Sequence, residues 1–372
     1  MKIAMIGQKG IPASFGGVER HVEELAPRLV KRGHKVTVYV RPHYTMSKMK
    51  SFCGVKLISL PSFKTKHFDA ISHTLFATIH ALFQDYDIIH YHSGGPSLVS
   101  WIPRIFRPRI KIIATFHSLE RLHQKWGLLA RLILRLGEWT CVKFPHQTIT
   151  VSKYLKQYCL DMYGKDTVYI PNGVSVKFTK SRAAKKIKKD YGLMTDQYIL
   201  TVSRLIPTKG IHYLIEAYKK LKTRKSLVIV GDSAYTDDYV KRLYKLADND
   251  PRIIFTGFQK GKSLSELYSN TYLFVLPSEV EGLPVSLLEA AGFGKRTLTS
   301  DIPANLEIVK VNDQVIGYTF RNKSINDLSK KLDEIIKHPK STQKTGKLAR
   351  TVVHKEFNWH KIARETENLY IV

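Results

Sequence analysis

The sequence predicts an α/β fold made of two doubly wound, Rossmann-like domains. The chain has 372 residues, which is long for one hydrophobic core and well suited to two domains. Its composition, with 43% hydrophobic and 24% charged residues, is that of a folded protein. In both halves, short β-branched runs alternate with amphipathic stretches. This alternation is typical of parallel sheets wrapped by helices.

The first half shows the alternation most clearly at its start. Apolar residues recur at helical spacing from Gly17 to Arg32, and Gly33 then supplies a C-terminal glycine. The expected strands of this half are Lys2–Ile6, Lys35–Val40, Ile88–Tyr91, Ile110–Thr115 and Thr148–Val151.

The second half repeats the same pattern of strands and helices. Its expected strands are Tyr198–Val202, Ser226–Val230, Arg252–Thr256, Leu273–Leu276 and Arg296–Thr299. Between them we expect helices over Ile211–Leu221, Asp238–Ala247, Ser263–Ser269 and Val285–Phe293.

A domain boundary is expected at the turn-forming segment Ile170–Val174. The basic, weakly apolar stretch Lys177–Asp190 follows it. This places a first domain over residues 1–172 and a second over residues 173–356. In sheets of this kind, ligands bind at the carboxyl ends of the strands, so we expect the two domains to face each other across a cleft.

Charge and cysteine content limit the classes of protein to consider. The net charge of +29 favours an anionic partner, whether nucleic acid, an acidic membrane surface or a phosphorylated substrate. Charged residues interrupt every stretch of the length that a membrane-spanning helix needs, so no spanning helix is expected. The first apolar run is too short for a secretion signal. Cys53, Cys141 and Cys159 lack metal-ligand spacing and are expected to be free thiols in the cytoplasm.

The first candidate site is the glycine-rich loop Gly7–Gly17, which follows a strand and precedes a helix. Such a loop presents backbone N–H groups and the positive end of a helix to an anion. The segment does not match G-x-G-x-x-G, and Arg41 stands where a dinucleotide site has an acidic residue. We therefore expect it to line a phosphate-binding cleft rather than to bind a dinucleotide.

The second candidate site is the loop Ser203–Gly210, between a strand and a helix. Arg204 and Lys209 could converge there on a diphosphate, Arg204 as a planar fork and Lys209 as a point charge. The alternative is a solvated loop in a very basic protein. Its position at the carboxyl end of a strand favours a binding role.

The third candidate site is the segment Pro277–Ala290, where a strand is followed by a loop and a helix. Glu281 lies just ahead of the helix expected to begin near Val285, and Glu289 about one turn inside it. Backbone N–H groups at a helix start hold phosphates, and carboxylates accept hydrogen bonds from sugar hydroxyls.

In combination these segments resemble the retaining family-4 glycosyltransferases of the GT-B fold. The resemblance also includes Tyr169–Val174 and the opening Gly16–Arg20, and it covers nearly the whole chain in the expected order. The opening Gly10–Glu19 looks especially like that of bacterial rhamnosyl-, mannosyl- and galactosyltransferases of surface-polysaccharide assembly. The last segment, Phe357–Val372, is similar to the closing helix that crosses back to the first domain in this family.

The resemblance implies a role for each candidate residue. Arg204 and Lys209 would bind the donor diphosphate and stabilise the leaving group without a metal. Glu281 would hold hydroxyls of the transferred sugar, and Glu289 those of the ribose. Gly17 would let the substrates approach the first loop without a Cβ in the way, and His117 would contact the donor sugar and support transfer. The N–H groups expected to cradle the phosphates are those of Leu283, Val285 and Ser286.

The resemblance also implies the reaction. It is a retaining, metal-independent transfer of a hexose or deoxyhexose from a nucleotide-diphosphate sugar to a hydroxyl of a saccharide or lipid-linked acceptor. No cofactor is expected. The acceptor would attack the face from which the nucleotide leaves, with a β-phosphate oxygen taking the proton. The sequence departs from the family pattern at Phe293–Thr297, which lacks a proline, and at Asp301–Ala304, which lacks a leading glycine.

Three further interpretations stay open in the sequence. The stretch Trp101–Lys156 has eleven Lys and Arg residues and two acidic ones, which suits either a peripheral contact with the inner face of the plasma membrane or a helix packed on a sheet. A nucleotide-sugar epimerase of the same architecture is an alternative function. A basic nucleic-acid-binding protein is another, although no basic recognition helix is evident, and nucleic acid is not an expected partner.

Asp248-Asn249-Asp250 is expected to be a solvated turn rather than a metal site.

Overall fold

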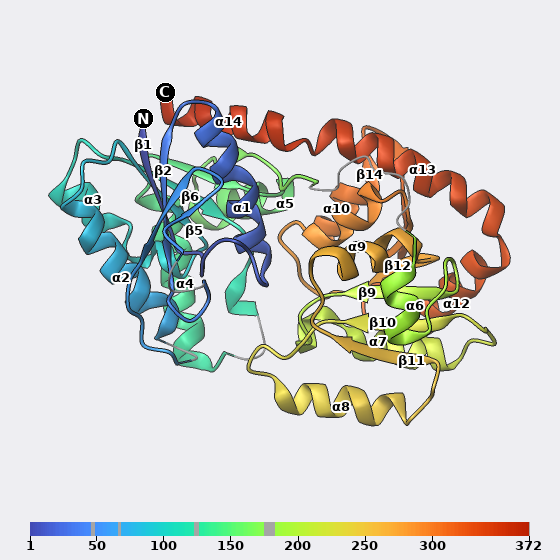
Figure 1. Ribbon diagram of the computed structural model, residues 1–372. Helices are drawn as coiled ribbons and strands as arrows, with labels where there is room; N and C mark the ends of the chain where they lie inside the picture. The colour runs from blue at the N-terminus through green and yellow to red at the C-terminus, as the bar shows by residue number, and fades with distance from the viewer. Residues whose placement is uncertain (46–48, 66–67, 123–125, 175–182, 372) are drawn as a thin grey trace. The chain divides into compact units, whose positions relative to one another are not determined.

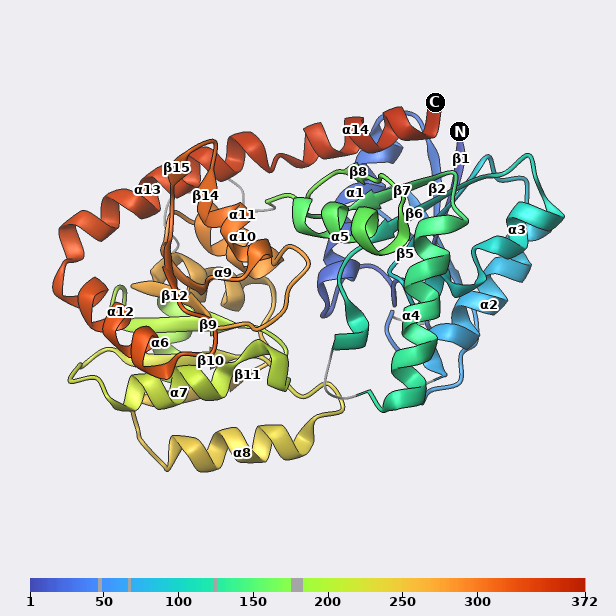
Figure 2. The same cartoon turned by 180° about the vertical axis from the view of Figure 1, so that it is seen from behind.

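The chain forms two compact units, described by a computed structural model. The structure describes residues 1–45, 49–65, 68–122, 126–174 and 183–371. The first unit comprises Met1–Gly173 together with Phe357–Val372, and the second comprises Val174–Glu356. Each is a parallel sheet with helices on both faces (Figures 1 and 2). The predicted α/β fold with two doubly wound domains is confirmed.

The sheet of the first unit has eight strands within the described residues, in the order β3-β4-β2-β1-β5-β6-β7-β8. Neighbouring strands are parallel except for the short pair β3 and β4. The strands are β1 (Lys2–Ile6), β2 (Lys35–Val40), β3 (Ser51–Phe52), β4 (Val55–Ser59), β5 (Ile88–His92), β6 (Lys111–Phe116), β7 (Gln147–Thr150) and β8 (Val168–Tyr169).

Helices cover both faces of this sheet. On one face, α1 and α14 pack against each other and against a cluster that includes Ile3, Met5 and Val38. The other face carries the remaining helices of the unit (Figures 1 and 2). The helices are α1 (Gly17–Lys31), α2 (Asp69–Leu82), η1 (Pro96–Val99), α3 (Trp101–Phe106), η2 (Glu120–Leu122), α4 (Leu128–Lys143), α5 (Lys153–Tyr163) and α14 (Trp359–Ile371).

The second unit contains a six-stranded parallel sheet, counted over its described residues, in the order β11-β10-β9-β12-β13-β16. Its strands are β9 (Tyr198–Val202), β10 (Ser226–Val230), β11 (Ile253–Gly257), β12 (Leu273–Leu276), β13 (Arg296–Ser300) and β16 (Tyr318–Phe320). The short strands β14 (Lys310–Val311) and β15 (Gln314–Val315) form a separate antiparallel pair.

Two groups of helices sandwich this second sheet. A core cluster containing Ile215, Leu243 and Leu332 packs α7, α8 and α12 on one face. On the other face, α10 contacts β12 and β13, and α13 packs on α10. The helices are α6 (Lys185–Tyr191), η3 (Pro207–Lys209), α7 (Ile211–Lys219), α8 (Asp237–Ala247), α9 (Gly261–Asn270), α10 (Val285–Gly292), α11 (Pro303–Val309), α12 (Ile325–Lys337) and α13 (Pro339–Glu356).

Local sequence rules explain the elements that were predicted. In α1, the predicted apolar positions Val22, Leu25 and Leu29 are fully buried, and Gly33 follows the helix with a φ of 92°. Each strand and helix specified above is present, with ends shifted by at most two residues. The part of the predicted basic stretch at residues 177–182 lies outside the described residues, and its end forms α6.

Both sheets reverse their strand order at one point. In the first sheet this point lies between β1 and β5, and in the second between β9 and β12. Connections leave such a pair of strands toward opposite faces, and ligands of doubly wound sheets bind beside the carboxyl ends of these strands. The loops after these four strands are therefore the places to look for a site.

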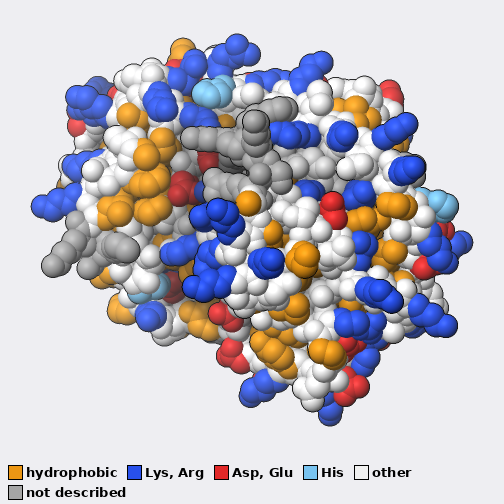
Figure 3. All heavy atoms as spheres, turned by 45° about the vertical axis from the view of Figure 1, so that its right-hand side comes forward, with side chains coloured by type: hydrophobic (Ala, Val, Ile, Leu, Met, Phe, Trp, Pro, Cys, Tyr) orange, Lys and Arg blue, Asp and Glu red, His pale blue; other side chains and the backbone are white. Residues whose placement is uncertain are grey.

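The excess of basic residues is visible at the surface. Figure 3 shows one face of the molecule, on which Lys and Arg side chains are far more numerous than Asp and Glu side chains. This agrees with the net charge of +29. A positive potential of this kind attracts anionic ligands over long range at low ionic strength.

Candidate functional site

At the reversal point of the second unit, an ion pair joins two of the predicted site residues. Lys209 lies on the loop after β9 and Glu281 on the loop after β12, 72 positions apart in the sequence. The Lys209 Nζ and Glu281 Oε1 atoms are 2.5 Å apart, and both side chains are largely buried. The tertiary structure thus brings the second and third sequence motifs together.

Several contacts hold these two loops in register. The Glu279 N–H donates to the Thr208 carbonyl at 2.8 Å. The Tyr213 hydroxyl donates to Glu279 Oε1 at 3.0 Å, and Lys323 Nζ lies 3.0 Å from the other carboxylate oxygen of Glu279. Glu279 therefore ties its own loop to α7 and to the chain after β16.

Gly210 allows the two loops to approach each other. Its φ is 67°, and a Cβ at this position would lie 2.0 Å from the Pro277 carbonyl oxygen. Only glycine fits such a contact in the left-handed region without displacing backbone. This glycine is the last residue of the predicted Ser203–Gly210 loop.

Charge is concentrated at this point of the second unit. Burial lowers the pKa of Lys209, the nearby positive charge of Arg204 adds to this effect, and Glu281 opposes it. Arg204 is exposed, so its guanidinium is available to a ligand. Two cations with one partly buried carboxylate form a site that can accept a doubly charged anion such as a diphosphate.

The start of α10 lies directly after Glu281 and contributes backbone donors. Helix α10 begins at Val285, as predicted, after Pro284 at the N-cap, which makes no side-chain capping bond. The N–H groups of Val285 and Ser286 are in the first turn, where an α-helix offers them no carbonyl partner. Leu283 is buried and Glu289 is half-buried within the helix. This end of α10 is suited to bind phosphate.

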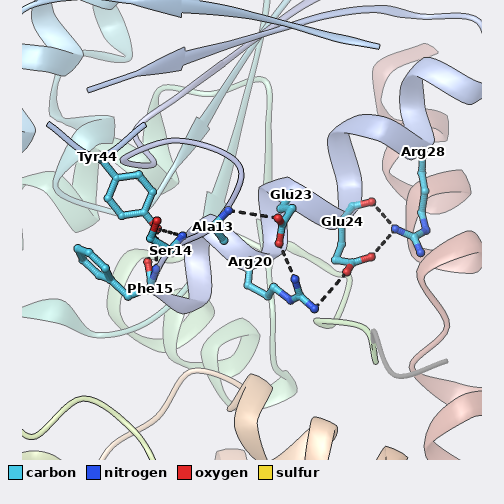
Figure 4. Close-up of polar contacts among 8 residues, drawn as sticks. All are labelled: Ala13, Ser14, Phe15, Arg20, Glu23, Glu24, Arg28 and Tyr44. Atoms are coloured by element: carbon cyan, nitrogen blue, oxygen red, sulfur yellow. Dashed lines mark hydrogen bonds and ion pairs between the residues drawn. The ribbon is translucent and has the colours of Figure 1, made fainter. Parts of the chain in front are cut away.

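In the first unit, the glycine-rich loop after β1 is held in place by Tyr44. The Tyr44 hydroxyl accepts hydrogen bonds from the N–H groups of Ser14 and Phe15, both at 2.9 Å, and donates to the Phe15 carbonyl at 2.5 Å (Figure 4). The buried carboxylate of Glu19 accepts from the Lys9 N–H at 2.9 Å. Gly17, which is exposed, is the first residue of α1 beside this fixed loop.

Helix α1 carries a row of ion pairs. Arg20 contacts Glu23 at 2.5 Å and Glu24 at 3.6 Å, and Arg28 contacts Glu24 at 2.6 Å (Figure 4). Glu23 also accepts from the Ala13 N–H at 3.2 Å. These i, i+3 and i, i+4 pairs stabilise the helix and fasten it to the loop that precedes it.

A group of buried histidines occupies the reversal point of the first unit. His92 ends β5, His117 follows β6, and His21 lies on α1. His92 Nδ1 and His117 Nε2 are 3.2 Å apart, and His21 Nδ1 is 2.9 Å from Asn172 Oδ1. His90 stacks on His92 and bonds to Tyr370 of α14 and to Thr115.

These histidines are neutral in the folded protein. Burial lowers the pKa of His21 to about 4 and that of His90 to about 3. Burial also holds the pKa of both His92 and His117 well below the ordinary value. A neutral imidazole can donate from one nitrogen and accept at the other, so His117 can hydrogen-bond a sugar hydroxyl.

The same group is the one set of described residues whose arrangement could hold a metal ion. One ring nitrogen from each of His21, His92 and His117 lies within 4.8 Å of the others. Neutral imidazole is a common metal ligand. The same residues also make hydrogen bonds without a metal, His92 with His117 and His21 with Asn172. The expectation that the reaction needs no metal remains a prediction.

The structure also shows what sequence reasoning missed. His21, His92, Glu279 and Tyr213 were not predicted to belong to a site. His92 directly follows a predicted strand, which was an available signal, whereas His21 lies within a helix and gave none.

The predicted turn at Asp248–Asp250 is confirmed, because Asp248 and Asn249 have φ values of 54° and 53° and Asp250 pairs with Arg252 at 2.7 Å.

Comparison with protein families decides the assignment. The family model for "Glycosyltransferase Family 4" matches residues 15–178, and the model for "Glycosyl transferases group 1" matches residues 183–352. The two matches are consecutive and together span most of the chain. The chain belongs to the family-4 glycosyltransferases. The family favours glycosyl transfer over the epimerase and nucleic-acid-binding alternatives.

Relatives of this glycosyltransferase match it along its full length. An uncharacterized glycosyltransferase of Methanocaldococcus jannaschii is 27% identical over 100% of this chain and 98% of that protein. A GDP-mannose-dependent phosphatidylinositol monomannoside mannosyltransferase of Mycobacterium tuberculosis is 24% identical over 98% of this chain and 96% of that protein.

Solved structures of similar fold support the architecture. The sucrose-phosphate synthase of Thermosynechococcus elongatus has a TM-score of 0.83 at 22% identity, covering 99% of this chain and 98% of that one. HepE of Anabaena, in complex with UDP and glucose, has a TM-score of 0.83 at 19% identity and full coverage of both chains. The glycosyltransferase therefore has the GT-B fold.

Proposed function

We propose that this glycosyltransferase moves a hexose or deoxyhexose from a nucleotide-diphosphate sugar to a hydroxyl of a saccharide or lipid-linked acceptor. The observation that carries the proposal is the Lys209–Glu281 pair, 2.5 Å apart, with Arg204 close by and the start of α10 directly after it. Positive charge, backbone donors and a carboxylate are the groups that a diphosphate attached to a sugar requires.

The relatives support a nucleotide-sugar donor of this kind. The Mycobacterium tuberculosis relative is named as GDP-mannose-dependent and acts on a phosphatidylinositol mannoside. The Anabaena structure of similar fold was solved with UDP-glucose. We therefore propose a nucleoside diphosphate as the leaving group, whichever base and sugar it carries.

In the second unit, each residue would have a distinct task. Arg204 and Lys209 bind the diphosphate oxygens and stabilise the charge that develops as the sugar leaves. The N–H groups of Leu283, Val285 and Ser286 hold the phosphates at the positive end of α10. Glu281 accepts hydrogen bonds from the transferred sugar, and Glu289 from the ribose.

Lys209 and Glu281 neutralise each other when no donor is bound. A lysine buried without a counter-ion would be costly, so Glu281 keeps this charge in place. When a diphosphate binds, it supplies new negative charge to Lys209, and one oxygen of Glu281 becomes available to a sugar hydroxyl. The pair is thus suited to a donor that carries a diphosphate for Lys209 and a sugar hydroxyl for Glu281.

In the first unit, we propose that His117 contacts the sugar and that Gly17 leaves space at the loop for substrate. Neutral His117 hydrogen-bonds a sugar hydroxyl without adding a further positive charge beside Arg204 and Lys209. We further propose that the reaction retains the anomeric configuration and needs no metal. The acceptor proton would then pass to a leaving phosphate oxygen.

The proposal is tested first by binding. A nucleotide sugar that binds only the folded protein raises its melting temperature by mass action. We expect a stabilisation of about 2.7 kcal/mol when the donor is present at 100 times its Kd. A screen of UDP, GDP, ADP and dTDP sugars identifies the donor, and the absence of stabilisation by any of them would contradict the proposal.

Substitution of the two cations then tests the assigned site. Arg204→Ala and Lys209→Ala should lower kcat by about 100-fold or more, because each removes stabilisation of the leaving diphosphate. Without donor, Arg204→Ala should leave the melting temperature little changed, whereas Lys209→Ala should lower it, because it leaves the largely buried Glu281 carboxylate without its counter-ion. Lys245→Ala, at an exposed position of α8, is the matched control and should keep full activity. Full activity of either site variant would refute the assignment to the diphosphate.

Transfer, configuration and metal dependence need separate measurements. Release of nucleoside diphosphate that depends on a saccharide or lipid acceptor supports transfer, whereas interconversion of the donor sugar supports an epimerase. Proton NMR of the product measures the anomeric configuration. Activity that survives dialysis against a strong chelator supports a metal-independent reaction, and activity restored only by a divalent ion contradicts it.

A further inference from the structure

One face of the first unit exposes several large apolar side chains. It is formed by α2, α3 and α4, which lie side by side on the same side of the first sheet (Figures 1 and 2). On α4, Leu128 is 86% exposed, Leu129 73% and Leu132 65%. Apolar groups gathered in this way mark a surface that contacts something other than water.

The exposed residues of α4 form a continuous stripe along the helix. Leu128, Leu132, Leu136 and Trp139 follow one another at spacings of three and four residues, and all four are exposed. Gly137, Glu138 and Cys141, on the opposite side of the helix, are buried. Helix α4 therefore buries the side that carries Gly137, Glu138, Cys141 and Val142 and turns most of its large apolar residues outward.

Helices α3 and α2 extend this surface. Arg104 of α3 donates to the Phe144 carbonyl at the end of α4, and Arg107 donates to the Leu82 carbonyl at the end of α2, each at 2.7 Å. These bonds place the exposed side chains of Ile105 and Phe83 on neighbouring elements of one surface. We call this surface, formed by α2, α3 and α4, the apolar-basic face.

Positive charge borders the apolar stripe. Arg131 and Arg135 lie on α4, one turn apart along the edge of the stripe, and Lys143 lies at its end. All three are exposed, and none has an ion-pair partner within the part of the chain that the structure describes. The acidic residue of this helix, Glu138, is instead buried and bound to Arg121. Cations beside exposed leucines match an anionic lipid surface, whose headgroups meet the cations while its acyl chains meet the leucines.

Helix α4 does not have the properties of a membrane-spanning helix. None of the described helices combines the length and hydropathy needed to cross a bilayer. Helix α4 has 16 residues, and one side of it is packed on the protein. An amphipathic helix with these properties binds in the plane of the interface.

We propose that the apolar-basic face docks this protein onto an anionic lipid bilayer. Leu128, Leu129, Leu132 and Trp139 insert between the headgroups, while Arg131 and Arg135 pair with lipid phosphates. The proposal does not depend on the donor site, which lies in the other unit. Membrane docking would favour transfer to a lipid-linked acceptor, because it would hold the enzyme at the surface where such an acceptor resides.

The test is co-sedimentation of the full chain with vesicles. We expect it to bind vesicles of equimolar phosphatidylglycerol and phosphatidylcholine, to bind pure phosphatidylcholine vesicles weakly, and to lose affinity as salt is raised. Combined Leu129→Ser, Leu132→Ser and Leu136→Ser substitutions should lower the partition coefficient at least about 10-fold, because the apolar contact is removed. Arg131→Gln with Arg135→Gln should reduce binding and its dependence on salt.

Matched controls distinguish vesicle binding by this surface from nonspecific binding by any exposed apolar residue. Leu306→Ser, Val315→Ser and Leu348→Ser change exposed apolar residues of the second unit, which are 39%, 61% and 42% exposed, and should leave vesicle binding unchanged. The altered α4 residues are exposed, so the melting temperature and its increase with a nucleotide sugar should persist in every variant. That readout distinguishes a failure of the membrane proposal from a failure of the donor site.

Three outcomes would overturn the membrane proposal. The first is equal binding to anionic and neutral vesicles, and the second is full binding by the α4 triple variant. The third is concentration-dependent self-association in analytical ultracentrifugation that the α4 substitutions abolish, without any binding to vesicles, since it would assign the face to a second copy of the chain.

Discussion

The Lys209–Glu281 pair shows how two residues can serve both stability and binding. The lysine is largely buried, and its pKa is lowered by burial, so an isolated ammonium would be poorly tolerated there. The carboxylate at 2.5 Å keeps the charge in place until an anionic ligand arrives. The residues that stabilise this part of the unliganded protein are then the ones proposed to bind substrate.

His117 can be tested apart from the donor diphosphate, since it lies in the first unit. We expect His117→Ala to lower kcat about 10-fold to 100-fold, the effect of losing one positioned hydrogen-bonding group. The increase in melting temperature with nucleoside diphosphate alone should stay as in the wild type. His146→Ala, whose ring lies elsewhere and bonds to the Ile112 N–H, serves as the comparison. Loss of diphosphate binding in His117→Ala would contradict the assigned role.

Gly210 gives a second prediction at the scale of single residues. Gly210→Ala should lower the free energy of unfolding by about 2–3 kcal/mol, because it combines a left-handed backbone with a clash against the Pro277 carbonyl. Gly192→Ala is the matched control, because that glycine has the same φ of 67° but open space around its Cβ position. It should cost about 1 kcal/mol. Urea unfolding measures both, and equal costs would show that the clash is relieved.

At the scale of elements, the loop between β1 and α1 depends on contacts from outside it. Tyr44 bonds to three backbone groups of Ser14 and Phe15, and Glu19 and Glu23 of α1 bond to others. The glycines of this loop were evident in the sequence. Its fixed shape was not, because it comes from Tyr44, about 30 residues away in the chain.

Tyr44→Phe should therefore loosen the loop without unfolding the unit. We expect faster amide hydrogen exchange at Ser14 and Phe15, a loss of stability of about 1–3 kcal/mol, and lower transfer activity. Tyr235→Phe, at an exposed position, should change none of these. Unchanged exchange at residues 14–15 would show that the hydroxyl is not what holds the loop.

Helix α4 illustrates the limit of periodicity at the same scale. The run Trp126–Arg135 is amphipathic in the sequence, and this left two interpretations open, a membrane contact or ordinary packing. Periodicity defines the sides of a helix but not which side meets the sheet. In the structure, the backbone of Gly137 lies so close to Gly94 that a Cβ at position 137 would be 2.7 Å from the Gly94 carbonyl oxygen. This close approach of the two backbones is possible only if the Gly137 side of α4 faces inward.

At the scale of the whole molecule, the buried histidines should make stability depend on pH. The pKa of His21 is about 4 in the folded protein and about 6.5 in the unfolded chain. Between these values the unfolded chain binds a proton that the folded protein does not, so the free energy of unfolding falls as the pH falls from 6.5 to 4. His21 alone should account for roughly 3 kcal/mol, and none of this loss occurs above pH 7.

Urea unfolding across this pH range measures the effect. His21→Gln keeps a hydrogen-bonding side chain opposite Asn172 and removes the titration, so stability of this variant should depend less steeply on pH. NMR of the imidazole protons should show His21 neutral down to about pH 5. An identical slope in the variant, together with protonation near pH 6.5, would contradict the expected burial.

The sequence by itself determined the alternation of strands and helices, the start of α10 at Val285 and the strand-end position of Arg204, Lys209, Glu281 and His117. These features are local, because side-chain periodicity and turn residues act over a few positions. Only the tertiary structure decided that Lys209 pairs with Glu281, that His21, His92 and His117 meet, and that the leucines of α4 face outward. Those contacts depend on strand order and on which side of each helix packs, and both are set by burial of apolar surface across the whole chain.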